Sequence, residues 1–347
     1  MINLSKLRNF DKALDYHLKY FETENLETLI GIIGRYVGTK KGEFFRCLLL
    51  NYKKIIVGKP KELEEIVSML KRHFPHYYSG LMENSKNRSS EIKLLAEELE
   101  SVFNYKHFSE YRKVKWNAYQ YINLLKIESC PYCDRNYITV HVGYYESEDE
   151  NKVFEPKTRP HLDHFLDKSK HPYLAISLYN LIPCCYVCNS SFKGSKLFTT
   201  QTHLHPFVEG FDNYVKFSID FKGSASHDFD YDIKDLFRSK YTIKLINKEH
   251  DDPGFFDRVE RNKRVFQLEN IYNYHKSISD ELINQNLVYT PDRISEIYKS
   301  IPGLFTSEED VKLTLLGLKG INLIERDKRT FSKYIKDISE ELGLLRK

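Results

Sequence analysis

Two stretches of the chain each carry a pair of cysteines, Cys130-Pro131-Tyr132-Cys133 and Cys185-Tyr186-Val187-Cys188. Each Cys-x-x-Cys pair places two thiolates on one tight turn, and four thiolates complete the tetrahedral shell of a structural zinc ion. The pairs are about 50 residues apart, whereas a simple zinc ribbon separates them by roughly 15 to 20. The spacing therefore indicates that zinc closes the base of an insertion.

The second pair has a spare neighbour, Cys184, so either Cys184 or Cys185 is the ligand. We choose Cys185 because it forms the Cys-x-x-Cys spacing with Cys188. The alternative is that all of these are buried free cysteines, but two complete pairs favour metal binding. The sixth cysteine, Cys47, lies in an apolar run and is predicted to be a core residue.

The insertion between the pairs contains a second group of polar residues. Their order is Asp163-His164, then Asn180-Leu181, then Asn189 directly after the last cysteine. This order resembles the HNH endonuclease family, whose ββα-metal finger has Asp-His, Asn-Leu and Cys-x-x-Cys followed by Asn or His. The spacing is also similar to the HNH domain of the RNA-guided CRISPR effector nucleases. The chain departs from the family where Asp167 replaces a frequent proline.

The chemistry of phosphodiester cleavage explains these residue types. His164 has an ordinary imidazole pKa of about 6.5 and can accept the proton of an attacking water. Asp163 and Asn189 offer hard oxygen donors to a Mg²⁺ or Mn²⁺ ion, which neutralises charge on the phosphate. The resemblance assigns Asn180 a supporting role, in which it keeps the His164 ring in its catalytic orientation.

Two lysines follow the finger motif, Lys193 and Lys196, and we predict that they meet the phosphate backbone as point charges. The alternative is that both are ordinary solvated lysines. Four further histidines have no partner pattern and are predicted to be structural or surface residues, although His161 could lie near the metal. They are His161, His171, His203 and His205.

The run from His164 to Pro183 resembles the PtuB-type nuclease subunit of Septu antiphage defence systems, with a weaker likeness over 266–276. The resemblance implies a PtuA-like ATPase partner and a role in bacterial defence. A segment rich in cations and aromatics, 111–119, has a composition suited to binding a nucleic-acid strand. The same flanking regions could instead dock the partner protein.

Helical periodicity dominates outside the finger. We expect helices after Pro60, after the serines at 89 and 90, over about 108–126, after Asn189, over about 257–286, and after Ser307, where Asp310 completes a capping box. Period-two alternation or β-branched content predicts strands at 137–142, 214–221 and 241–246, and the acidic run 146–151 reads as a loop.

The predicted fold class is therefore α+β, with a zinc-stabilised ββα-metal finger between mainly helical flanks. The expected regions are a helical N-terminal part at 1–128, the finger at 129–200, and a mostly helical C-terminal part at 201–347 with a hairpin near 214–246. The +4 formal charge permits a polyanionic partner without requiring one. Neither a secretory signal nor a membrane span is evident, so we expect a cytoplasmic protein without a membrane partner.

Three functions remain open on the sequence. The first is a metal-dependent DNA endonuclease, and DNA is the more favoured nucleic acid. The second is a ribonuclease that uses the same site, for example on transfer RNA, because the metal and the base act on a phosphate and do not select the sugar. The third is a zinc-finger interaction module without catalysis, against which the intact set Asp163, His164 and Asn189 argues.

Overall fold

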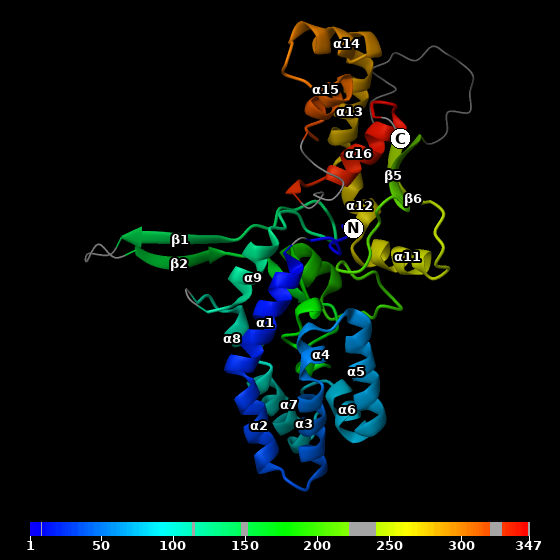
Figure 1. Cartoon of the computed structure of the whole chain (residues 1–347). Helices are drawn as coiled ribbons and strands as arrows, with labels where there is room; N and C mark the ends of the chain where they lie inside the picture. The colour runs from blue at the N-terminus through cyan, green and yellow to red at the C-terminus, as the bar shows by residue number, and fades with distance from the viewer. Residues whose placement is uncertain (8, 113–114, 147–151, 222–240, 320–327, 346–347) are drawn as a thin grey trace.

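The computed structural model of the chain is an α+β molecule in which the N-terminal helices and the C-terminal helices lie at opposite ends (Figure 1). It describes every residue except 8, 113–114, 147–151, 222–240, 320–327 and 346–347. The helices that precede the first cysteine pair are α1 (Phe10–Glu24), α2 (Leu26–Arg35), α3 (Lys40–Leu50), α4 (Tyr52–Val57), α5 (Pro60–His73), α6 (Pro75–Met82), α7 (Ser90–Val102), α8 (Tyr105–Ser109) and α9 (Ala118–Leu125).

In the part of the chain that the structure describes, the strands form three separate antiparallel hairpins. They are formed by β1 (His141–Glu146) with β2 (Lys152–Thr158), β3 (His161–His164) with β4 (Leu181–Cys184), and β5 (Val215–Phe221) with β6 (Tyr241–Asn247). The first hairpin projects from the body of the molecule as an arm (Figure 1). Two 3₁₀ turns, Pro172–Leu174 and Leu178–Asn180, lie between β3 and β4, and a π-helical segment, Val187–Lys193, follows β4.

Helices also make up much of the described part of the C-terminal region. They are α11 (Phe255–Val265), α12 (Leu268–Asn273), α13 (Lys276–Val288), α14 (Pro291–Ser300), α15 (Glu308–Leu315) and α16 (Ser332–Glu341). The helix α16 lies against β5, where the Asp337 carboxylate accepts a hydrogen bond from the Phe217 backbone N–H at 3.0 Å. The β5–β6 hairpin is thus covered by the C-terminal helices (Figure 1).

Several predicted elements are confirmed where local chemistry decides them. Ser89 caps α7 by accepting from the backbone N–H of Ile92, and Ser307 caps α15 by accepting from that of Asp310. The hairpin expected near 214–246 is present, with Phe217 opposite Leu245. The strand expected at 137–142 begins only at His141, and the loop expected at 146–151 falls, after Glu146, outside the described residues.

The single helix expected over about 108–126 is wrong. Only Ala118–Leu125 is helical there, after the short α8 that ends at Ser109. The buried Asn117 side chain accepts from the N–H groups of Tyr119 and Gln120, which starts a new helix at that point. Its amide donates to the carbonyls of Arg112 and Lys115, which ties these two residues to the start of α9.

The helix expected over about 257–286 is also divided. Gln267 has a positive φ of 51° between α11 and α12, and a second break at His275 precedes α13. The first break brings the buried Phe266 ring onto Tyr132 of the first cysteine turn, with centroids 4.4 Å apart and an 18° interplanar angle. Tertiary packing of the aromatic ring therefore overrides a helical pattern.

One apolar core runs through the described parts of all three regions. Its members include Phe21 of α1, Leu181 of β4 and Tyr334 of α16, each essentially inaccessible to solvent. The predicted core residue Cys47 is half-buried and packs against this core. The finger is consequently held by packing from both flanks. No helix in the described part of the chain combines the length and apolarity that crossing a membrane requires.

Candidate metal centre and cleft

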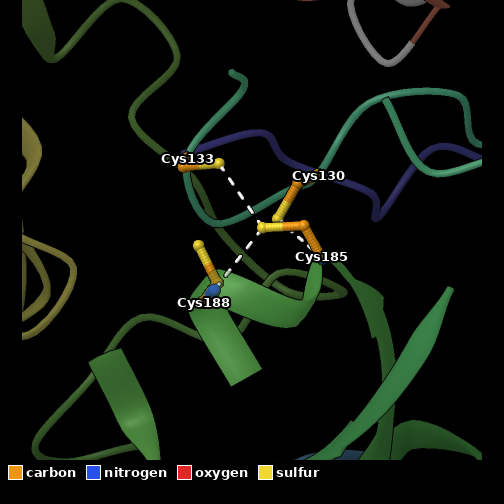
Figure 2. A group of neighbouring side chains, drawn as sticks. All are labelled: Cys130, Cys133, Cys185 and Cys188. Carbon is orange, nitrogen blue, oxygen red and sulfur yellow. Dashed lines mark hydrogen bonds between the residues drawn. The ribbon is translucent and has the colours of Figure 1, made fainter. Parts of the chain in front are cut away.

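The two predicted cysteine pairs meet in space. The sulfur atoms of Cys130, Cys133, Cys185 and Cys188 all lie within 4.8 Å of one another, and all four residues are buried (Figure 2). The first pair comes from the turn after α9, and the second comes from the end of β4 and the first turn of Val187–Lys193. The cluster thus joins two segments that are far apart in the sequence.

The cluster fits a tetrahedral zinc ion. Zn–S bonds of about 2.3 Å place sulfur atoms about 3.8 Å apart, and Cys133 and Cys185 are separated by 4.0 Å. Hydrogen bonds from the neighbouring thiols, Cys130 first, lower the pKa of Cys185, whereas burial raises the pKa of Cys130. Several thiolates this close repel one another, so only a bound cation lets all four ionise together. These four cysteines could therefore hold a structural metal such as zinc.

The positions of the cysteine sulfur atoms favour Cys185 over Cys184 as a ligand. Cys184 is the last residue of β4 and is fully buried, but its sulfur is not part of the cluster. The sulfur of Cys185, the residue after the strand, is in the cluster. The amide of Asn136 donates to the Cys185 sulfur at 3.2 Å, as expected of a thiolate.

The β3–β4 hairpin and the π-helical segment form the platform of the site. His161 pairs with Cys184 and His164 pairs with Leu181, so Asp163 and His164 lie on the strand whose partner leads into the cysteine cluster. The backbone N–H of Gly194 bonds the carbonyl of Asn189 at 2.9 Å, the i→i+5 bond of a π-helix. With this winding, residues four apart share a face, and π-helical turns often occur at functional sites.

His164 is half-buried, and one of its ring nitrogens is held by the backbone. Its Nε2 lies 2.9 Å from the carbonyl oxygen of Ala175, so Nε2 carries the proton and donates it. Burial, followed by the positive charge of Lys168, lowers the pKa of His164 from 6.5 to about 3. The ring is therefore neutral at ordinary pH, and no described residue hydrogen-bonds to its Nδ1.

Asn180 supports the loop that carries Ala175. Its side chain is buried, accepts from the Leu166 N–H at 2.6 Å, and donates to the carbonyls of Leu166 and Leu174. These three bonds join the end of β3 to the residue before Ala175. Asn180 thus acts on the orientation of His164 through the backbone that accepts the His164 proton.

Asp163 and Lys193 form a buried ion pair. The Lys193 ammonium lies 2.7 Å from Oδ1 of Asp163, and the Tyr132 hydroxyl donates to Oδ2 at 2.6 Å. Lys193 also donates to the carbonyl of His164 at 2.6 Å and is itself 2% exposed. Lys193, for which the sequence suggested a phosphate contact, thus neutralises the carboxylate that was predicted to bind a metal.

Asn189 and His161 lie together at the open side of the platform. The Asn189 amide is 3.2 Å from Nδ1 of His161, and His161 is exposed. Lys196, the other predicted phosphate contact, is exposed and bonds the carbonyl of Phe192. Among the remaining histidines, His205 is buried away from this surface.

A cleft of about 680 Å³ opens over the platform, and Asp163, His164, Asn189 and Lys193 all line it. Sequence analysis missed three residues of its wall. Tyr105 packs edge-on against His164 with centroids 4.6 Å apart, and Arg159 and Lys168 also line the cleft. The spacing of the motif gave no signal for them, because they come from α8, from the β2–β3 connection and from the loop after β3.

Comparison with known proteins identifies no relative of this chain. No family model matches it, and no curated protein and no solved structure is significantly similar to it. Any assignment of function therefore depends on the sequence motif and on the residues of the cleft.

Proposed function

We propose that the chain is a metal-dependent endonuclease of the HNH type that hydrolyses phosphodiester bonds of DNA. In this proposal it is the effector nuclease of a bacterial antiphage defence system and acts with a PtuA-like ATPase. The order of the finger residues supports the chemistry, and the resemblance of 164–183 to PtuB-type subunits supports the defence role and the partner.

The state of His164 is the single observation that carries the proposal. A general base needs a neutral ring with an available lone pair near the reacting water. The bond from Nε2 to the Ala175 carbonyl assigns the proton to Nε2, and burial keeps the ring neutral. Nδ1 of His164 can then accept the proton of a water bound in the cleft.

The donors around the cleft are of the kind that Mg²⁺ or Mn²⁺ prefers. Asp163 and Asn189 would hold the ion, which would supply positive charge beside the phosphate when bound. Each carboxylate oxygen of Asp163 accepts one hydrogen bond and retains a second lone pair. The ion must nevertheless compete with the Lys193 ammonium for Oδ1, so divalent cations should bind only modestly without substrate phosphate.

The test is cleavage by purified protein in Mg²⁺ or Mn²⁺, with and without the ATPase of the same system. Plasmid DNA and total RNA are offered separately, and His164→Ala is the matched control because it leaves the cysteine cluster intact. We expect nicking or cutting of DNA that the variant loses by a factor of about 10² to 10⁴, the usual contribution of a general base.

The same assay decides between the three functions. Cleavage of RNA but not DNA, again lost in His164→Ala, would replace the proposal by a ribonuclease. If wild type and His164→Ala cleave both substrates equally, or not at all, with the partner present, the remaining function is the interaction module without catalysis. Zinc content, measured on the same samples, shows that the variant is folded in either case.

A further inference from the structure

We propose that Arg159 and Lys168 form a two-cation site beside His164 that binds backbone phosphates of a nucleic acid. The proposal rests on the function proposed above, since it names how the substrate of that cleft is held. It replaces the predicted phosphate contact of Lys193, whose ammonium is already bound to Asp163.

Arg159 is fixed by the strands on both sides of it. It lies in the connection between β2, which ends at Thr158, and β3, which begins at His161. Its Nη1 donates to the carbonyl of Pro160 at 2.9 Å, and its guanidinium lies 5.6 Å from the ring centroid of Tyr119. The side chain is half-buried and lines the cleft, so a planar donor group is presented there in a defined orientation.

Lys168 is exposed, on the loop that follows β3, and its Nζ lies 4.5 Å from the ring centroid of Tyr105. The N-terminal helices hold this loop. Arg88 donates to the carbonyl of Ser169, and Lys170 donates to that of Met82 at 2.6 Å. An ammonium on an anchored loop is a suitable point charge for a phosphate.

Tyr105 connects the two cations to the predicted base. Its ring contacts His164 edge-on, its face lies under Lys168, and its hydroxyl is close enough to Arg159 for the guanidinium charge to act on it. Burial raises the pKa of Tyr105, so the hydroxyl stays protonated. Both cations are therefore placed by an aromatic side chain that also sets the position of His164.

The charges of the cleft leave these two cations available. Among the described residues, neither Arg159 nor Lys168 forms an ion pair with a carboxylate, whereas Lys157 pairs with Glu155. Lys193 is likewise paired, with Asp163, so Asp167 is the remaining carboxylate among the described residues that line the cleft.

A phosphodiester is the ligand class that fits this arrangement. Arginine gives two parallel hydrogen bonds to phosphate oxygens, and lysine adds a point charge. Aromatic side chains next to such cations are typical of surfaces that follow a nucleic-acid strand. Because phosphates carry no sequence information, the two-cation site should position the backbone without selecting bases.

The experiment measures binding without cleavage, on the His164→Ala background. A fluorescein-labelled DNA duplex, its single strand and the equivalent RNA strand are titrated with protein at several salt concentrations. Arg159→Gln and Lys168→Gln are compared with Lys299→Gln, an exposed lysine of α14 outside the cleft. We expect each cleft variant to reduce the slope of log K against log salt by about 0.9 on duplex DNA or about 0.7 on a single strand.

The control variant should keep the full slope. Unchanged slopes for both cleft variants, or no binding of any of the three probes, would overturn the two-cation site. The two-cation site is tested separately from the proposed nuclease, because cleavage by the wild-type protein tests the nuclease. If the cleft variants reduce the salt slope but the wild-type protein cleaves nothing, the phosphate-binding site is supported and the nuclease is not. If the protein cleaves but the slopes are unchanged, the nuclease is supported and the two-cation site is not.

Tyr105 provides a second, independent measurement. Tyr105→Phe keeps the ring under Lys168 but removes the hydroxyl near Arg159, whereas Tyr105→Leu removes both. We expect the salt slope to fall slightly in the first variant and further in the second. Equal slopes in wild type, Tyr105→Phe and Tyr105→Leu would contradict the placement of the cations by this ring.

Discussion

The indole N–H of Trp116 donates to Nδ1 of His17 over 3.0 Å, and this bond fixes the proton of His17 on Nε2. Nε2 then donates to the carbonyl of Ile176 at 2.5 Å. Ile176 follows Ala175, the residue whose carbonyl accepts the proton of His164. A buried histidine of α1 thus supports the loop that orients the predicted base.

The first prediction concerns His17. His17→Gln can accept from Trp116 and donate to Ile176, whereas His17→Phe leaves both groups without a partner. We expect the phenylalanine variant to lose about 2 kcal/mol or more of unfolding free energy, because each stranded buried group costs about 1–3 kcal/mol. Urea unfolding measures this loss, and the nitrogen chemical shifts of the His164 ring report whether its proton stays on Nε2. If His17→Phe is as stable as His17→Gln, the hydrogen bonds of His17 to Trp116 and Ile176 do not stabilise the fold.

The second prediction concerns acid. Burial lowers the pKa of His17 to about 4 and that of His205 to about 3, both from 6.5. The unfolded chain therefore binds these protons first as the pH falls, so stability is complete above about pH 6.5 and decreases below it. Each histidine contributes a slope of about 1.4 kcal/mol per pH unit until its folded pKa is reached.

Unfolding free energies measured between about pH 7 and about pH 4 test this slope. In His17→Gln, the unfolding free energy should change less steeply with pH, because the contribution of His17 is lost and that of His205 remains. Constant stability over this range in the wild type would show that the rings are solvated in the folded state.

The third prediction concerns zinc. Cys185→Ser removes a ligand of the cluster, and Cys184→Ser changes an equally buried neighbour outside it. We expect Cys185→Ser to lose bound zinc and to melt at a lower temperature, because structural zinc contributes directly to folding. Cys184→Ser should retain zinc. Metal analysis of both proteins shows which of the two cysteines binds zinc. If only Cys185→Ser retains zinc, the ligand is Cys184.

The fourth prediction concerns the pair of Asp163 and Lys193. Lys193→Met leaves a buried carboxylate without its cation, which costs about 3–5 kcal/mol. If Asp163 is a metal ligand, added Mn²⁺ replaces the lost charge and raises the melting temperature of this variant more than that of the wild type. The double variant with Asp163→Asn removes the carboxylate and should not respond. If Mn²⁺ does not raise the melting temperature of Lys193→Met, Asp163 is not a ligand of the metal.

The sequence by itself determined the elements whose signals are local. Two Cys-x-x-Cys turns predict a four-cysteine cluster, and the capping serines Ser89 and Ser307 start helices where expected, because caps, turns and strand alternation involve residues that are neighbours in the chain. The order of Asp163, His164, Asn180 and Asn189 also predicts that they gather on one platform, and all four lie on or beside the β3–β4 hairpin and its π-helical segment.

Only the tertiary structure decided how those residues are used. Lys193 is bound to Asp163, Arg159 and Lys168 meet at Tyr105, and the helices at 108–126 and 257–286 are interrupted. Each of these outcomes depends on contacts between residues distant in sequence and on removal of charges and rings from water. The free energies of such burial are larger than helical propensities, and periodicity along the chain does not record them.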